Sequence, residues 1–371
     1  MEAEFNYVDS QVGLEALVAH LHLARRISID TEADNLHHYH TRVCLLQISA
    51  GGVEFLVDTL AGLDLRSLFT ALTGKSLIMH GSDYDLRLLW ELCRFRPVEV
   101  FDTMLAAQLG GITRFGLSSL LDELLGIHHP KDSQKSDWSR RPLPPKMLFY
   151  AARDVKHLED LRAALLSRLE SLGRTEWHRQ KCEWQIEVAT SGFPGADENS
   201  WRLGPSRHFS PRAQAALYEL WHWRDGESRR LDRPPFKVIS NEYLTKLALA
   251  VDSGTWRDAF ESLPKGLKRG PSRGLMDALA RGKSRDPKTL PRRPETRERR
   301  QPLSAQELSR QDKIRSCRDK HSRELEIDPT LIASRSQIAQ LARQPDAADK
   351  VLLPWQAALL RPALDACLAA W

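Results

Sequence analysis

Asp30 and Glu32, two acidic residues separated by one position, stand in a segment that is otherwise typical of a β-strand. Alternate residues of a strand project from the same face, so the two carboxylates are predicted to lie side by side. Carboxylate oxygens are ligands that Mg²⁺ and Mn²⁺ prefer, and a divalent cation would offset the repulsion between the two acids. The alternative is a strand end with two solvated acids, which the D-x-E spacing alone favours.

A second acidic pair, Asp83 and Asp85, follows His80 at a point where a strand gives way to a helix. Asp85 stands three residues after Ser82, which is the spacing of a capping box, so helix stability alone would explain its carboxylate. Asp83 would favour the helix dipole in the same way. The chemical alternative is that one of these aspartates joins the carboxylates of the preceding strand.

A third candidate group is Tyr150 and Asp154, which lie in a long segment from Pro144 whose apolar residues are spaced three and four apart. This spacing predicts one long helix, with the prolines in its first turn. Positions four apart share a helix face, so a phenol hydroxyl and a carboxylate can converge on one point. The structural alternative makes Tyr150 a core aromatic and Asp154 an ion-pair partner of a neighbouring basic residue.

The elements that must position these side chains form an alternating pattern up to about residue 100. RRISIDTE, VCLLQISA and VEFLVDT are rich in Val and Ile, and Gly51-Gly52 between the second and third predicts a hairpin. Helices are predicted at about 64–73 and 83–94, with the strand KSLIMHG between them. Paired strands followed by alternating strands and helices predict a mixed α/β sheet.

In this order, D-x-E on a strand, Asp at a helix start and Y-x₃-D on a later helix resemble the DEDD superfamily of 3′→5′ exonucleases, specifically its tyrosine-bearing subgroup. The flanking segments resemble ribonuclease D in five successive blocks over about residues 5–172. These blocks are IDTEADNLHHYHTRVCLLQIS, MHGSDYDLRLL, FDTMLAAQLGG, SDWSRRPLP and YAARDVKHL.

The resemblance implies a ribonuclease H-like fold and assigns a role to each candidate. It implies that two Mg²⁺ or Mn²⁺ ions are held by four carboxylates and that Tyr150 positions the attacking water. Two such ions can activate water and stabilise the leaving 3′ oxygen. The implied metal ligands are Asp30, Glu32, Asp85 and Asp154.

Three further assignments follow from the same resemblance. Asp85 is preferred to Asp83 because the family aspartate directly precedes the aliphatic residue of the helix. Phe149 occupies the position at which the histidine-bearing subgroup has its His, so the tyrosine subgroup fits better. By spacing, His128 and His129 are not catalytic candidates.

Basic and aromatic residues around the segment KDSQKSDWSRRPLP suggest substrate contacts, since such a pattern suits phosphate attraction and base stacking. The predicted contacts are His80, Lys135, Trp138, Arg140 and Arg141, with Lys131 as a further basic neighbour. Trp138 could equally pack under the long helix.

Four other polar residues near the D-x-E strand and the later FDT segment have plainer interpretations. His37, His38 and His40 are predicted to be solvated loop residues, with phosphate or base contact as the alternative. Asp102 is predicted to cap a helix at 103–110.

The second half of the chain has no convincing strand beyond residue 173. Helices are predicted at about 176–190, 210–230, 241–251, 304–324, 331–343 and 354–370, and Ser304 with Glu307 predicts a capping box. LYELWHWRDGESRRLDRPPFKVISNEYLTKLA resembles the HRDC module (helicase and RNase D C-terminal), and a later segment resembles a second, divergent copy. The predicted domains are 1–173, 208–285 and 302–371, with an Arg/Pro-rich charged linker at 281–300.

Charge divides the 371-residue chain in the same way. Residues 1–170 carry a net charge of −5 and the remainder carries +10, which suits an acidic metal site and a basic segment that holds a polyanion. An acidic start without an apolar region and the absence of a long apolar run disfavour secretion and membrane spanning. Five widely spaced cysteines without a CxxC pair favour a reducing, cytoplasmic setting.

Together these observations predict a metal-dependent 3′→5′ exoribonuclease that trims the 3′ ends of structured RNA, including tRNA precursors, and releases 5′ mononucleotides. The expected partner is RNA with an accessible 3′ end, and no motif suggests obligate assembly, so a monomer is expected. Two alternatives remain at this point: a 3′→5′ DNA exonuclease and a non-catalytic nucleic-acid-binding scaffold.

Overall fold

A computed structural model describes residues 5–129, 133–195, 197–264, 272–292 and 302–368. Contacts group the chain into two compact units. Unit 1 comprises residues 1–33, 43–193 and 300–371, and unit 2 comprises residues 34–42 and 194–299. No helix among the described residues is both long and apolar enough to cross a membrane.

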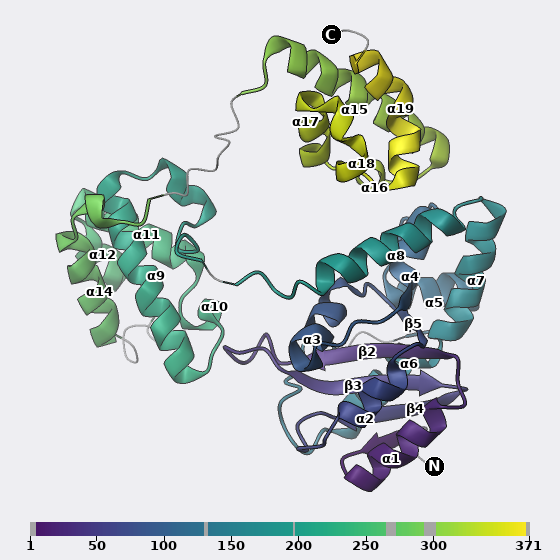
Figure 1. Cartoon of the computed structure of the whole chain (residues 1–371). Coiled ribbons are helices and arrows are strands. Elements are labelled where there is room, and N and C mark those ends of the chain that lie inside the picture. The colour runs from purple at the N-terminus through teal and green to yellow at the C-terminus, as the bar shows by residue number, and fades with distance from the viewer. Residues whose placement is uncertain (1–4, 130–132, 196, 265–271, 293–301, 369–371) are drawn as a thin grey trace. The chain divides into compact units, whose positions relative to one another are not determined.

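Unit 1 contains a mixed sheet of six strands in the order β1-β4-β3-β2-β5-β6 (Figure 1). The strands are β1 (Asn6–Val8), β2 (Arg26–Ala33), β3 (Val43–Ala50), β4 (Val53–Asp58), β5 (Ser76–Met79) and β6 (Glu99–Asp102). The β2–β3 and β3–β4 pairs are antiparallel, and the other three pairs are parallel. Gly51 and Gly52 have φ values of 60° and 82°, as a tight hairpin between β3 and β4 requires, so the predicted hairpin and mixed sheet are confirmed.

Helices cover both faces of this sheet. They are α1 (Gln11–Leu21), α2 (Arg66–Leu72), α3 (Asp83–Cys93), α4 (Thr103–Leu109), α5 (Leu117–Leu125), α6 (Pro145–Lys156), α7 (Leu158–Ser171) and α8 (Thr175–Ala189). On one face, Ile27 and Ile29 of β2 join the apolar side chains of α1, α2 and α3 in a buried cluster. On the other face, Leu45 and Leu56 pack against α6, so Asp30 and Glu32 emerge between the sheet and this helix.

The prediction of one long helix from Pro144 is wrong, because the segment forms two helices, α6 and α7, that meet at His157. His157 has φ −111° and ψ 12°, which ends α6 and allows α7 to begin in a new direction. The apolar spacing continues through the break, since Val155 and Leu158 belong to the same buried cluster. The change of direction lets α6 pack on the sheet while α7 packs on α4 and α5.

Helix α8 lies beyond the predicted bound at residue 173 but packs into the sheet region. Its Gln185 donates hydrogen bonds to Ser82 Oγ (2.7 Å) and to Asp102 Oδ2 (3.1 Å). His178 on the same helix lies 2.9 Å from the carbonyl oxygen of Asp102. This helix therefore supports the loop from which α3 begins.

The remaining helices form two modules, one in each unit. The first has α9 (Pro211–Leu231), α10 (Pro235–Val238), α11 (Asn241–Ser253), α12 (Trp256–Glu261) and α14 (Ser272–Ser284). The second has α15 (Ala305–Leu325), α16 (Pro329–Ile332), α17 (Arg335–Arg343), α18 (Ala348–Val351) and α19 (Pro354–Leu368). The predicted fold class, a mixed-sheet domain followed by an all-helical region, is confirmed.

The first three helices of each module repeat one local design. Helices α9 and α15 both have 21 residues, and each ends in a left-handed residue, Asp232 or Glu326. A four-residue helix and one extended residue follow in both modules, before a serine caps the next helix. In each, a buried arginine on the first helix donates to the carbonyl of the extended residue: Arg224 to Ile239 and Arg318 to Ala333. This likeness supports the predicted second copy, and the predicted Ser304–Glu307 capping box is confirmed.

The predicted charged linker begins too early in the sequence. Helix α14 continues to Ser284, and both Arg281 and Arg285 bind the carboxylate of Glu219, at 2.8 and 2.6 Å. Residues 281–285 are therefore part of the first module. The linker's later residues, 293–300, lie outside the described ranges.

Candidate active site

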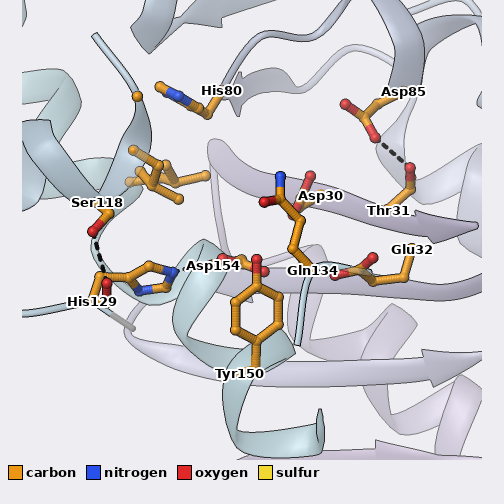
Figure 2. A pocket seen from close by; sticks show the side chains of 13 residues that line it. Asp30, Thr31, Glu32, His80, Asp85, Ser118, His129, Gln134, Tyr150 and Asp154 are labelled. Carbon is orange, nitrogen blue, oxygen red and sulfur yellow. Dashed lines mark hydrogen bonds and ion pairs between the residues drawn. The ribbon is translucent and has the colours of Figure 1, made fainter. Parts of the chain in front are cut away.

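A cavity of about 340 Å³ brings together the five residues that the sequence singled out (Figure 2). Strand β2 supplies Asp30 and Glu32 on one face, directly opposite Gln47 and Leu45 of β3. The other lining residues are Thr31, His80, Asp85, Gly116, Leu117, Ser118, His129, Gln134, Tyr150, Asp154 and Leu158. Carboxylates from a strand and two helices thus face one cavity.

Asp85 enters this cavity from the first turn of α3, and its local structure contradicts the capping-box alternative. The Ser82 side chain makes no capping bond to the helix, because its hydroxyl donates to Asp102 Oδ2 at 2.9 Å. Asp102 also accepts from the backbone N–H groups of Gly81 (3.0 Å) and Ser82 (2.7 Å). The Asp85 carboxylate instead accepts a hydrogen bond from the Thr31 hydroxyl of β2.

Asp102 stabilises the beginnings of two helices, α3 and α4. Its Oδ1 accepts from the backbone N–H groups of Met104 (2.9 Å) and Leu105 (3.2 Å), which confirms the predicted cap of the helix that follows. Its bonds to Gly81 and Ser82 hold the turn that precedes α3. Asp102 is fully buried and does not line the cavity, so its role is to position Asp85 through the backbone.

Tyr150 and Asp154 lie one turn apart on α6, and both are buried, with exposed fractions of 9% and 5%. The tyrosine hydroxyl and the Asp154 carboxylate are hydrogen-bonded to each other. The Nε2 atom of His129 lies 2.9 Å from Asp154 Oδ1. Asp154 therefore has two polar neighbours besides the carboxylates of β2.

Burial raises the pKa of every carboxylate in the cavity, and repulsion from neighbouring carboxylates adds to the rise for Asp30 and Glu32. Burial raises the pKa of Asp30 well above its usual value, and the charges of Asp85 and Asp154 add to the effect. Burial and the charge of Asp30 act in the same direction on the pKa of Glu32. Burial raises the pKa of Asp85 to about 7, although the Thr31 hydrogen bond opposes the rise.

The same cause acts on the two residues of α6. Burial raises the pKa of Asp154 even though His129 and Tyr150 donate to it, and burial with the charge of Asp154 raises the pKa of the Tyr150 phenol. No lysine or arginine is among the described residues that line the cavity. The site therefore combines four acids with no cation of its own, which is the electrostatic signature of a functional position.

The donor set tests whether a divalent metal fits. As placed, no three His, Cys, Asp or Glu side chains of the described residues form a ready group that could hold an ion. Asp85 accepts a hydrogen bond from Thr31, and Asp154 lies within hydrogen-bond distance of His129. Even so, four carboxylates around one cavity supply the oxygen donors that Mg²⁺ and Mn²⁺ prefer, and a cation would relieve the repulsion that raises their pKa values. By the chemistry of their donor atoms, the residues present fit such an ion.

The predicted substrate contacts divide into three that face solvent or the cavity and two that do not. His80 lines the cavity, where its Nδ1 lies 2.9 Å from the Thr103 hydroxyl and burial lowers its pKa. Lys135 and Arg140 are exposed, and Arg140 binds Asp137 at 3.0 Å. Lys131 lies outside the described residues.

Trp138 and Arg141 are placed where they cannot serve as predicted. Trp138 is 1% exposed and packs in the cluster under α6, so it offers no ring face to a base. Arg141 donates to both oxygens of Asp58 (2.5 and 2.6 Å) and to the carbonyl of Cys44 (2.7 Å). These contacts contradict the expected RNA contacts and make both residues part of the protein's internal packing.

Two of the histidines after the D-x-E strand have polar partners. His38 Nδ1 lies 2.7 Å from Asp232, and His37 Nδ1 lies 3.4 Å from Lys237, all within unit 2. Both side chains stay partly exposed, and His40 is exposed, so the three remain loop residues at the surface, two of them with polar partners.

Four of the cavity's polar residues had no role predicted from the sequence. They are Thr31, Ser118, His129 and Gln134. Thr31 stands between the two acids of the D-x-E motif, but strand alternation places it on the opposite face, so its contact with Asp85 could not be predicted from this motif. The other three come from α5 and the segment after it. Gln134 stands within KDSQKSDWSRRPLP, where only basic and aromatic residues were predicted to contact substrate, and His129 was set aside by its spacing.

The site and sheet define a class of protein, and comparison with known families identifies it. Residues 5–170 match the sequence family described as 3′-5′ exonuclease, and residues 213–252 match the HRDC domain. The chain is 31% identical over 263 residues to the ribonuclease D of Xanthomonas oryzae pv. oryzae, covering 68% of this chain and 71% of that protein. The chain thus belongs to the ribonuclease D family of 3′-5′ exoribonucleases.

Other relatives extend the likeness over nearly the whole chain. The ribonuclease D of Gluconacetobacter diazotrophicus is 29% identical over 352 residues, covering 92% of this chain and 87% of that one. The crystal structure of Escherichia coli RNase D shares the fold with a TM-score of 0.72 at 23% identity, covering 99% of both chains. A protein from Bifidobacterium adolescentis gives a TM-score of 0.81 at 22% identity, covering 99% of this chain and 98% of that one.

Proposed function

We propose that this exoribonuclease removes nucleotides from accessible RNA 3′ ends, tRNA precursors among them, by metal-assisted hydrolysis that releases 5′ mononucleotides. The observation that carries the proposal is the cavity in which four acids meet Tyr150 without a described lysine or arginine. The proposal also includes an oligomeric state and a location: the protein acts as a monomer, and it acts in the cytoplasm.

In this proposal each side chain has a definite task. Asp30, Glu32, Asp85 and Asp154 would hold two divalent ions, Mg²⁺ or Mn²⁺. Bound there, the ions would supply a water of lowered pKa and stabilise negative charge on the leaving 3′ oxygen. The Tyr150 hydroxyl, whose raised pKa keeps it protonated at neutral pH, would orient the attacking water by a hydrogen bond. His80, on the cavity wall, would contact the substrate.

The test compares the parent chain with Asp154→Asn on RNA and on DNA of equal length, with Mg²⁺ or Mn²⁺ and with a chelator. Asp160→Asn is the matched control, because Asp160 is an exposed acid on the next helix. We expect stepwise shortening of RNA that requires metal, that Asp154→Asn lacks and that Asp160→Asn retains. Preferential shortening of DNA would favour a DNA exonuclease, and no hydrolysis by the parent would favour a non-catalytic scaffold.

We further propose that Lys135 and Arg140 attract the RNA backbone near the cavity. Both are exposed and stand in the segment that leads from α5 to α6. The double variant Lys135→Ala, Arg140→Ala should weaken RNA binding and reduce the dependence of binding on salt by about one to two released ions. An unchanged salt dependence would exclude these residues as phosphate contacts.

A further inference from the structure

His129 is a buried polar residue in direct contact with one of the proposed metal ligands, and no role was predicted for it from the sequence. It stands in the segment that follows α5, and it is 5% exposed. Its Nε2 atom lies 2.9 Å from Asp154 Oδ1, and its ring centroid lies 5.8 Å from that of Tyr150. Figure 2 shows the imidazole beside Asp154 on the wall of the cavity.

The backbone of His129 is anchored as well. The Ser118 hydroxyl of α5 donates to the His129 carbonyl oxygen at 2.7 Å, which ties the segment to the helix (Figure 2). His129 is therefore held at two points. Ser118 binds its backbone carbonyl oxygen, and Asp154 binds its imidazole ring. A side chain with so little freedom can impose an orientation on its partner.

The bond constrains how Asp154 can present its oxygens. With its proton on Nε2, the imidazole donates to Oδ1 and leaves other lone pairs of the carboxylate available. Carboxylates that bind metal ions are commonly oriented by such outer hydrogen bonds, and loss of the outer partner typically lowers metal affinity by about 10- to 100-fold. Asp85 has a comparable partner in Thr31, but that bond comes from a rotatable hydroxyl.

We propose that His129 is a positioning residue that orients the Asp154 carboxylate for the divalent metal. The inference rests on the proposed function, because it needs Asp154 to be a ligand. The proposal adds His129 to the residues of the D-x-E, Asp and Y-x₃-D signature. In it, His129 orients Asp154 through a hydrogen bond and does not contact RNA.

The test is calorimetric titration of Mn²⁺ into the full chain without RNA, using three variants. His129→Leu keeps the volume but removes the donor, and His129→Gln places an amide N–H near the position of Nε2. His128→Leu is the matched control, because His128 is the exposed neighbour. We expect about 10- to 100-fold weaker Mn²⁺ binding by His129→Leu. His129→Gln should recover most of the affinity, and His128→Leu should match the parent.

Kinetics on a short RNA give a second readout that a purely structural role would not produce. For His129→Leu, the Mn²⁺ concentration at half-maximal rate should rise, while the KM for RNA at saturating Mn²⁺ should stay near the parent value. A raised KM for RNA with unchanged Mn²⁺ affinity would overturn the inference in favour of substrate contact.

The outcomes separate this inference from the proposed function. If the parent binds no Mn²⁺, the proposed metal site fails and the inference fails with it. If the parent binds Mn²⁺ and His129→Leu binds it within twofold, only the inference is overturned. If His129→Leu does not fold, as judged by circular dichroism, Ser118→Ala takes its place. That variant should bind Mn²⁺ more weakly because the anchor of His129 is lost, and unchanged affinity would overturn the inference.

Discussion

Acids whose surroundings shift their pKa occur in both units of this protein, and they differ in what surrounds them. In unit 1, Asp30, Glu32, Asp85 and Asp154 share one cavity without a described lysine or arginine, and burial raises the pKa of each. In unit 2, Glu219 of α9 is 8% exposed, but Arg281 and Arg285 bind its two oxygens. Its pKa is lowered, because these hydrogen bonds outweigh the effect of burial.

The difference separates a structural charge from a functional one. A buried acid with hydrogen-bonded cations is satisfied within the fold, and removing one partner leaves an uncompensated charge. Four acids that repel one another destabilise the fold, and such an arrangement is expected where a ligand supplies the missing charge. Glu219 therefore holds α9 to α14, whereas the cavity carries the uncompensated negative charge that the proposed function assigns to metal binding.

The largest expected effect is on catalysis, and it tests the assignment of Asp85 over Asp83. Asp85→Asn should lower kcat by about 10³-fold, because metal coordination supplies several kcal/mol of transition-state stabilisation and each 1.36 kcal/mol is a factor of ten. Asp83 is exposed and paired with Arg87, so Asp83→Asn should change kcat by less than about threefold. Initial rates on a short RNA at saturating Mg²⁺ measure both values, and equal losses would remove the distinction between the two aspartates.

The pH dependence of stability should have opposite signs in the two regions. The pKa of Asp85 is about 7 in the folded chain and about 3.8 when unfolded, so the folded state binds the proton more tightly. Stability without metal should therefore fall as pH rises from about 4 to 7. Glu219 has a lowered pKa, so its contribution is complete above its unfolded value and is lost only at lower pH.

Urea unfolding with chelator at pH 5 and pH 8 measures this difference. The parent should lose about 2 kcal/mol more stability between these pH values than Asp85→Asn does, since one pKa unit corresponds to 1.36 kcal/mol. Glu219→Gln should keep the parent's change over this range. Identical changes for the parent and Asp85→Asn would show that Asp85 ionises freely in the folded chain.

A third prediction concerns the paired acid. Glu219→Gln should lower the free energy of unfolding by about 2 kcal/mol, because two charge-assisted hydrogen bonds become weaker and two arginines lose their partner. Glu227 on the same helix binds the more exposed Arg230 at 2.7 Å, so Glu227→Gln should cost less than about 1 kcal/mol. Urea unfolding at pH 7 compares the two variants, and equal losses would contradict a structural role for Glu219.

The residues that could be predicted from the sequence are those whose partners lie nearby in the chain. The D-x-E pair, the hairpin at Gly51-Gly52 and the Tyr150–Asp154 pair are set by the alternation of a strand or the turn of a helix. The convergence of these groups on one cavity was implied by a family resemblance, and the structure brings them together.

The residues that could not be predicted depend on partners far away in the sequence. Arg141 binds Asp58, 83 positions earlier, and nothing near Arg141 distinguishes this contact from a phosphate contact. Strand β1 has three residues and is held in the sheet by parallel pairing with β4. His129 lies 25 positions before Asp154 in the sequence, and no periodic pattern or motif indicates that the two residues meet.

The smallest expected effect concerns how much Arg281 and Arg285 each contribute to stability by binding Glu219. Arg281 has 54% of its side chain exposed, so Arg281→Gln should cost about 0.5 kcal/mol or less, because water screens the lost ion pair. Arg285 is 28% exposed and also lies over the ring of Tyr218 at 4.6 Å, so Arg285→Gln should cost about 1 kcal/mol. Each single variant leaves Glu219 with one cation, so the double variant should cost more than the two single losses added together. Additive losses in urea unfolding would mean that each arginine acts alone, and Glu219 would then not be a shared buried centre.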